Sequence, residues 1–234
     1  MSNLFQKEIL DEFKKLDSGS TKFNLPKYLG TNNKIYHLKN AVEKQIAKDF
    51  IKRHPDISKD QFLDLLDALY VGESFNERCF GTKLIPHKKS FKVLFSPRRV
   101  FDWLTNLFGW SEVDSLCQST FTAKDLLENW TEWESTIKKM AVDGNPSRRR
   151  ASLVLLTKSV RGSNDARLSK LAFKNIDLLK GEKDILITKA VSWLLRSLIK
   201  NHRVEVVDYI NKNRQILPKI AIRETERKLK TGRK

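Results

Sequence analysis

Two aromatic residues, one carboxylate and a cluster of arginines are the residues of this sequence best suited to chemistry on a charged substrate. Trp110 and Asp114 are four residues apart, so a helix would place the ring and the carboxylate on one face. Arg150 ends a run of three arginines, and Trp193 lies in the later segment TKAVSWLLRSL. Aromatic faces attract cations, whereas guanidinium groups bind anions. These residues therefore form the candidate site.

Each of these residues also has a structural interpretation. By default, Trp110 and Trp193 would pack into the core. Asp114 could close a capping box with Ser111, in which the two side chains satisfy backbone N–H groups at a helix start. The three arginines follow an expected helix start, where cations oppose the helix dipole. They are either a cluster that faces an anion or a solvated charge run. Each residue alone is explained by structure, so the functional interpretation depends on all of them lying together.

The charge of the chain indicates its class of partner. Lys and Arg number 45 against 28 acidic residues, a net charge of +17 over 234 residues. Such a field recruits polyanions, and nucleic acid is the usual one. The sequence has no apolar run long enough to span a bilayer and no apolar block of a signal peptide, and no long helix is basic on one face and rich in Trp and Leu on the other. We therefore expect a cytoplasmic protein with no membrane partner.

Cysteine and histidine are too sparse for a disulfide scaffold or a metal site. Cys79 and Cys117 are expected to be reduced core residues. The four histidines do not have the spacing of metal ligands, and no Cys–His cluster exists. We predict no metal, and nothing in the candidate site requires another cofactor.

The segments that must position the candidate residues show helical patterns almost throughout. Local start signals recur: capping boxes begin at Ser58, Ser74 and Thr122, and Asn145-Pro146 places a cap before a proline. A helix starting at Ser96-Pro97 is expected to run to residue 108 and to end at a glycine, Gly109, in the C′ position. We predict about a dozen helices with short connections and almost no strand.

Such a chain suits an all-α superhelix of HEAT-like helical pairs, curved and with a basic concave cleft. No Pro- or Ser-rich linker divides it, so we predict a single domain over residues 1–234. Within that domain, residues 1–36 are the least regular part. Residues 230–234 form a basic tail that is expected to fray.

Three motifs together resemble a known family. Trp110-Ser-Glu-Val-Asp114, the segment NPSRRRA that contains Arg150, and the segment KAVSWLLR that contains Trp193 follow one another in this order. Their order and separation are similar to those of the HEAT-like alkylpurine DNA glycosylases, DNA alkylation repair enzymes of the AlkC/AlkD type. The resemblance extends over most of the chain from about residue 38.

The resemblance implies a role for each residue. Trp110 and Trp193 match the two aromatics that line the lesion cleft, Asp114 matches the catalytic carboxylate, and Arg150 matches the arginine beside it. Tyr28 matches an aromatic that completes the cleft. The implied activity is hydrolysis of the N-glycosidic bond of cationic N3- or N7-alkylated purines, with the lesion held against an open cleft.

The implied partner is double-stranded DNA containing alkylated bases, bound by a monomer that associates with the nucleoid. Six further cations are candidates for phosphate contacts: Arg148, Arg149, Lys158, Arg161, Lys189 and Arg196. Two other functions stay open. One is a non-catalytic HEAT-like protein that binds DNA, including branched DNA, or RNA. The other is a helical scaffold whose charge recruits acidic proteins.

Overall fold

The computed structural model describes residues 3–20 and 23–233, and its secondary structure is helical. Over these residues there are fourteen α-helices and two short 3-10 helices, and the only β-type pairing is one isolated bridge between Lys34 and Ser74. The expected all-α class is therefore confirmed. The chain divides into two compact units, Met1–Leu116 and Cys117–Lys234.

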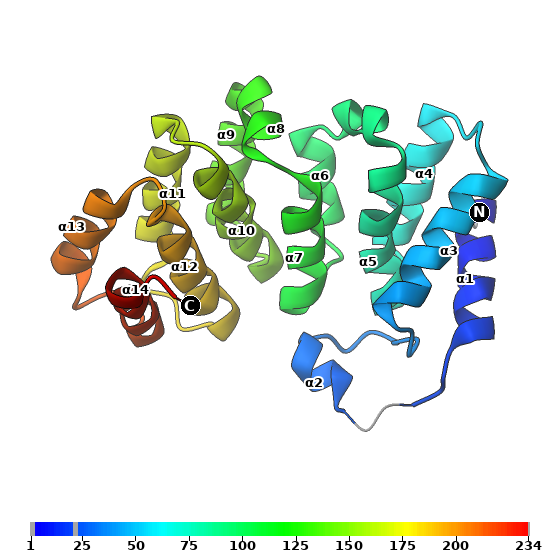
Figure 1. The fold of residues 1–234 in the computed structure, drawn as a ribbon, viewed down its shortest axis with the longest axis horizontal. Helices are drawn as coiled ribbons and strands as arrows, with labels where there is room; N and C mark the ends of the chain where they lie inside the picture. The colour runs from blue at the N-terminus through cyan, green and yellow to red at the C-terminus, as the bar shows by residue number, and fades with distance from the viewer. Residues whose placement is uncertain (1–2, 21–22, 234) are drawn as a thin grey trace. The chain divides into compact units, whose positions relative to one another are not determined.

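The first unit is built on three packed helices, with further helices around them. Helices α3 and α4 pack against α5, and α1 packs against α4 and α3 (Figure 1). Phe13 and Phe80 meet edge to face in its core, with ring centroids 5.0 Å apart. Its elements are α1 (Leu4–Leu16), α2 (Leu25–Leu29), α3 (Asn40–Arg53), α4 (Lys59–Tyr70), α5 (Phe75–Leu84), η1 (Ile85–His87), η2 (Lys89–Leu94) and α6 (Pro97–Trp103).

Helix α7 (Gly109–Thr120) begins in the first unit and ends in the second. In the second unit, α10, α12 and α14 pack side by side in one layer, and α9 and α11 pack against each other and against that layer (Figure 1). The apolar face of α10 is fully buried, so this helix forms the centre of the unit. The remaining elements are α8 (Ala123–Glu128), α9 (Trp130–Ala141), α10 (Pro146–Gly162), α11 (Ala166–Leu179), α12 (Ile185–Leu198), α13 (Arg203–Asn213) and α14 (Lys219–Thr231).

Local capping explains where most helices begin. The capping boxes at Ser58, Ser74 and Thr122 are all present. The side chain of Asn145 accepts the backbone N–H of Ser147 at the start of α10. These side chains satisfy N–H groups that have no partner within the helix, and the predicted starts are confirmed.

Two predicted helix ends differ from the structure. Helix α6 ends at Trp103 rather than at residue 108, and Gly109 is the first residue of α7, with a φ of +67°, so its assignment as a C′ residue is wrong. At the other end of the chain, α14 continues to Thr231, and Gly232 closes it in the left-handed conformation. Helix therefore reaches into the expected tail, whose last residue, Lys234, lies outside the described residues.

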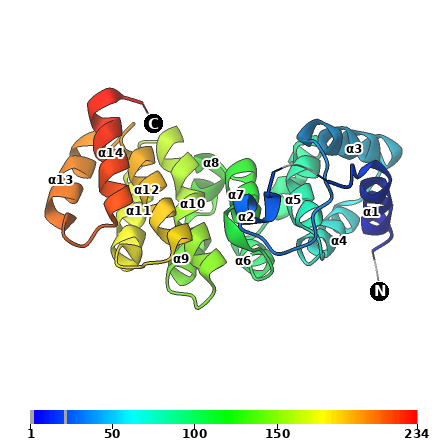
Figure 2. The same cartoon turned by 90° about the horizontal axis from the view of Figure 1, so that it is seen from below.

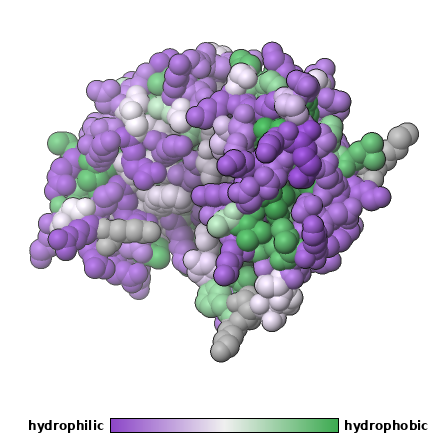
Figure 3. All heavy atoms as spheres, turned by 45° about the vertical axis from the view of Figure 1, so that its right-hand side comes forward, coloured by the Kyte–Doolittle hydropathy of each residue, from purple (hydrophilic) through white to green (hydrophobic). Residues whose placement is uncertain are grey.

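The surface carries the high charge of the chain. Most of the face seen in Figure 3 is hydrophilic, with smaller apolar areas between the polar atoms. Within the described residues, no helix combines the length and the apolar character that crossing a membrane requires.

Candidate functional site

Helix α7 presents Trp110 and Asp114 one turn apart, and both side chains are partly exposed. Ser111 is the third residue of this helix, so it cannot be the N-cap, and the capping box of Ser111 with Asp114 is wrong. A different carboxylate stabilises the helix start: Oε2 of Glu112 accepts the backbone N–H of Phe108 at 2.9 Å. Asp114 is the sixth residue of α7, beyond its first turn.

Tyr28 and Trp110 are in contact, although 82 positions separate them. The indole N–H of Trp110 donates to the carbonyl oxygen of Tyr28 at 2.6 Å. The two rings meet edge to face with centroids 5.5 Å apart, and Tyr28 is in similar contact with Phe23, at 5.2 Å. Tyr28 keeps 55% of its surface exposed. Figures 1 and 2 both show α2 beside the start of α7. Tyr28 and Trp110 thus form a partly exposed aromatic pair, and Trp110 lies one helical turn from the Asp114 carboxylate.

Two glycines allow the segment that carries Tyr28 to lie directly on α7. Gly30 ends α2 in the left-handed conformation, with a φ of +71°. A Cβ added to Gly109 would lie 2.1 Å from the carbonyl oxygen of Gly30, closer than any real contact. Only glycine at position 109 combines a positive φ with this close approach of two backbones.

Glu112 binds the same segment to α7 from inside the unit. Its side chain is fully buried, and its Oε1 accepts hydrogen bonds from the Thr31 hydroxyl and the Asn33 amide, both at 2.8 Å. The guanidinium of Arg78 lies 3.6 Å from its Oε2. Glu112 was not predicted from the sequence, although a carboxylate in the first turn of a helix is a local signal for such a role.

In the second unit, the three consecutive arginines all have protein partners. Arg148 pairs with Asp143 at 3.2 Å, and Arg149 pairs with Glu182 at 2.7 Å. Arg150 is only 4% exposed and donates to the carbonyl oxygen of Leu186, at the start of α12. These contacts exclude a solvated charge run. They fix Arg150 where α10 meets α12.

Helix α12 carries Lys189 and Trp193 on one face, because the two residues are four positions apart. Lys189 is exposed and Trp193 is partly exposed. Leu186, whose carbonyl accepts the Arg150 guanidinium, is one turn before Lys189 on the same helix. Within the second unit, Arg150 therefore contacts α12 one turn before Lys189 and two turns before Trp193.

The three other predicted phosphate-binding cations lie toward the C-terminal ends of α10 and α12. Lys158 donates to the backbone carbonyl of Gln118 at 3.2 Å, and a guanidinium nitrogen of Arg161 lies 3.5 Å from the Gln118 side-chain oxygen. Arg196 is 9% exposed and pairs with Glu224 at 3.1 Å. Burial, and then the charges of Arg196 and Arg161, lower the pKa of Lys228. Positive charge is thus concentrated at this end of the layer.

Among residues 3–20 and 23–233, no three His, Cys, Asp or Glu side chains lie close enough together to bind a metal ion. The expectation of no metal and no other cofactor stays a prediction.

Comparison with known proteins identifies the family. The family model described as DNA alkylation repair enzyme matches residues 9–229, nearly the whole chain. The chain belongs to the DNA alkylation repair enzyme family. In this family member, the aromatic pair of Tyr28 and Trp110 lies within the matched region. Asp114 and the face of α12 that carries Lys189 and Trp193 lie within it too. The resemblance inferred from three motifs is confirmed.

A solved structure has the same fold. It is described as a predicted DNA alkylation repair enzyme from Enterococcus faecalis, and it superimposes with a TM-score of 0.71 at 18% sequence identity. The alignment covers 88% of this chain and 93% of that one. Among curated proteins, none matches this DNA alkylation repair family member.

Proposed function

We propose that this family member is a monofunctional DNA glycosylase that hydrolyses the N-glycosidic bond of cationic N3- or N7-alkylated purines in duplex DNA. The observation that carries the proposal is the arrangement on α7. Trp110 is held by Tyr28, and Asp114 lies one turn further along the same helix. Aromatic rings beside a carboxylate suit a substrate that is cationic before and during the reaction.

The leaving purine does not need to be protonated by a general acid. An N3- or N7-alkylated purine already carries a positive charge, so it leaves as a neutral base when the bond from its nitrogen to C1′ breaks. The sugar becomes oxocarbenium-like as the bond breaks, and a water oxygen adds to C1′ and loses a proton. We assign to Asp114 the stabilisation of this positive charge and the orientation of the water.

Trp110 and Trp193 are proposed to stabilise the cationic base and sugar through their ring faces. Arg150 is proposed to bind the phosphate beside the lesion. Its guanidinium is positioned at the start of α12 by its hydrogen bond to the carbonyl of Leu186. Trp110 and Asp114 belong to the first unit, and Arg150 and Trp193 belong to the second. Their joint action on one lesion is part of the proposal.

The remaining cations are proposed to bind the DNA backbone, with different accessibility. Lys189 is exposed, and Arg148, Arg149, Lys158 and Arg161 are partly exposed. Arg196 is the most buried of the six and already pairs with Glu224, which favours a role in the local field over direct contact. A monomeric protein acting on chromosomal DNA inside the cell completes the proposal.

The deciding experiment measures base release from methylated duplex DNA. The purified protein is incubated with N-methylated DNA, and free 7-methylguanine and 3-methyladenine are quantified by chromatography. Release above the spontaneous rate supports the proposal. Tight DNA binding without release of either base would instead indicate the non-catalytic DNA-binding function.

A further inference from the structure

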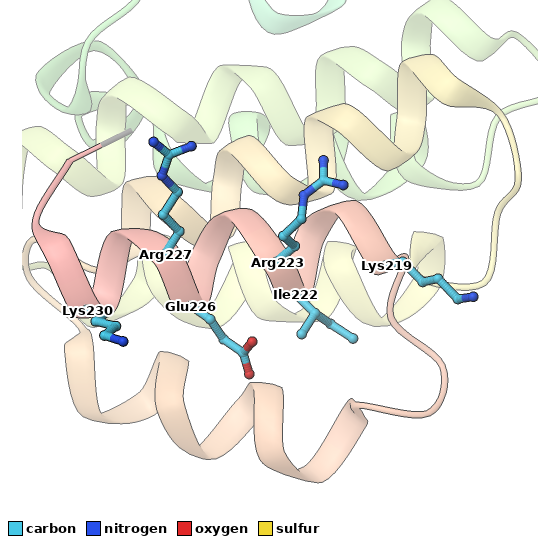
Figure 4. Close-up of a pocket in the computed structure, with 6 residues that line it drawn as sticks. All are labelled: Lys219, Ile222, Arg223, Glu226, Arg227 and Lys230. Carbon is cyan, nitrogen blue, oxygen red and sulfur yellow. The ribbon is translucent and has the colours of Figure 1, made fainter.

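The last helix of the chain carries a line of cations outside the candidate site. Lys219, Arg223, Arg227 and Lys230 of α14 are spaced by four, four and three residues, and all four are exposed. At 3.6 residues per turn, this spacing keeps them on one face of the helix. Figure 4 shows Arg223 and Arg227 pointing to one side of α14, with the two lysines at its ends.

These four side chains have no partner in the described part of the protein. None makes a hydrogen bond or an ion pair there through its charged group, in contrast to Arg148 and Arg149 of α10. The one carboxylate of this face, Glu226, is already paired with Arg214. The charge of the line is therefore not neutralised by neighbouring residues.

The opposite face of α14 is bound firmly to α12. Ala221 and Thr225 are fully buried. Glu224 accepts the hydroxyl of Ser192 at 2.7 Å, and Lys228 donates to the carbonyl of Arg196 at 3.0 Å. Because α12 also packs on α10, the line of cations is fixed within the layer that carries Arg150 and Trp193. The ligand therefore needs to order only the four side chains and not the helix that carries them.

The shape and the spacing indicate a polymer rather than a small molecule. The face forms an open hollow of about 390 Å³ in which Ile222 is the only apolar lining residue. Such an open surface cannot enclose a small ligand. The line extends about 16 Å along the helix axis at about 1.5 Å per residue. An equal length of duplex axis contains about five phosphates of each strand, at about 3.4 Å of axis per phosphate.

We propose that Lys219, Arg223, Arg227 and Lys230 of α14 bind the sugar-phosphate backbone of duplex DNA, away from the reacting base. This proposal rests on the proposed function for its choice of DNA as the polyanion. Like charges four residues apart destabilise a helix, so their presence along one face of α14 favours an external anion as their partner. The line supplies affinity that does not depend on the lesion, and it has no part in the chemical step.

The test compares two double variants of equal charge change. Arg223→Gln with Arg227→Gln removes the two central cations of the line. Lys170→Gln with Lys174→Gln removes two exposed lysines from α11, in the other layer of the same unit. Binding to undamaged duplex DNA is measured by fluorescence anisotropy over a salt series, and circular dichroism melts verify that all proteins are folded.

The slope of log Kobs against log salt is negative, and in the α14 variant it should be less steep by about 1.8, because each lost phosphate contact removes about 0.9. The α11 variant should keep the slope of the unchanged protein. Equal slopes for all three proteins would overturn the proposal, and so would a loss of binding to vesicles containing phosphatidylserine with unchanged DNA binding.

A second measurement separates this proposal from the proposed function. Release of 7-methylguanine in a single turnover at saturating protein should be the same for the α14 variant and the unchanged protein. A reduced saturated rate would place the line in the reaction and overturn its assignment as a backbone contact. If the unchanged protein releases no base, the glycosylase proposal fails, whereas the salt slopes still decide whether α14 binds DNA.

Discussion

The carbonyl oxygen of Gly30 lies so close to Gly109 that a Cβ on Gly109 would come within 2.1 Å of it. This backbone contact places the segment that carries Tyr28 against the helix that carries Trp110 and Asp114. The position of the aromatic pair, Tyr28 and Trp110, therefore depends on Gly109, a residue with no side chain.

Gly109→Ala should displace the α2 segment and strain the start of α7, because alanine adds a Cβ at a position with a φ of +67°. We expect a loss of about 1–3 kcal/mol in the free energy of unfolding, measured by chemical denaturation, and slower base release. The matched control is Gly144→Ala, where an added Cβ would meet nothing within 4 Å. Equal stability of the two variants would show that the contact is not tight in solution.

Glu112→Gln should loosen the same segment by a different route. Both carboxylate oxygens of Glu112 accept hydrogen bonds, so an amide must direct its NH2 group at a donor, either the Phe108 N–H or the Asn33 amide. A buried donor left without an acceptor costs about 1–3 kcal/mol. We expect a lower melting temperature and faster tryptic cleavage after Lys27 and Lys34.

The control for this substitution is Glu132→Gln, which makes the same change at an exposed carboxylate in the first turn of α9. It should change the free energy of unfolding by no more than about 0.5 kcal/mol. If both variants melt together and resist trypsin equally, Glu112 does not position the Tyr28 segment.

The buried carboxylate Glu43 should make stability depend on pH. Burial raises the pKa of Glu43 above its usual value of 4.5, although Asn76 and Lys83 act in the opposite direction. The folded state then holds its proton more tightly than the unfolded state, so this group's contribution to stability falls as pH rises from 4.5 through the folded pKa.

Glu43→Gln keeps an acceptor for Asn76 and removes the ionised form. Its melting temperature should exceed that of the unchanged protein at pH 7.5, and the difference should shrink as the pH falls toward 4.5. Melting curves across this range measure the difference. A difference that stays constant with pH, or that grows in acid, would contradict the assigned direction of the pKa.

Local signals in the sequence predicted the fold well. Ser58, Ser74, Thr122 and Asn145 mark helix starts because each side chain bonds a backbone N–H within three residues of itself. Gly109 was assigned to the wrong side of a helix boundary. Its conformation is set by contact with Gly30, 79 positions earlier, and periodicity carries no record of such a contact.

The candidate site was predicted less completely. Resemblance to a family suggested that Tyr28 accompanies Trp110, and the two rings are in contact, but no local pattern indicated that contact. The arginine run was interpreted as facing an anion or solvent. In the structure, Arg149 forms an ion pair with Glu182, which lies in a turn later in the chain. Glu112 was missed because its importance comes from the Thr31 and Asn33 partners that folding brings to it.

The central claim is that Asp114 stabilises positive charge in the reaction. The most direct measurement is the single-turnover rate of 7-methylguanine release by folded Asp114→Asn, beside Asp102→Asn as an exposed carboxylate control on α6. We predict that the rate falls by about 10²-fold or more for Asp114→Asn, with DNA affinity held or raised because a negative charge has been removed. The Asp102 variant should keep its rate. Unchanged release by folded Asp114→Asn would contradict the claim.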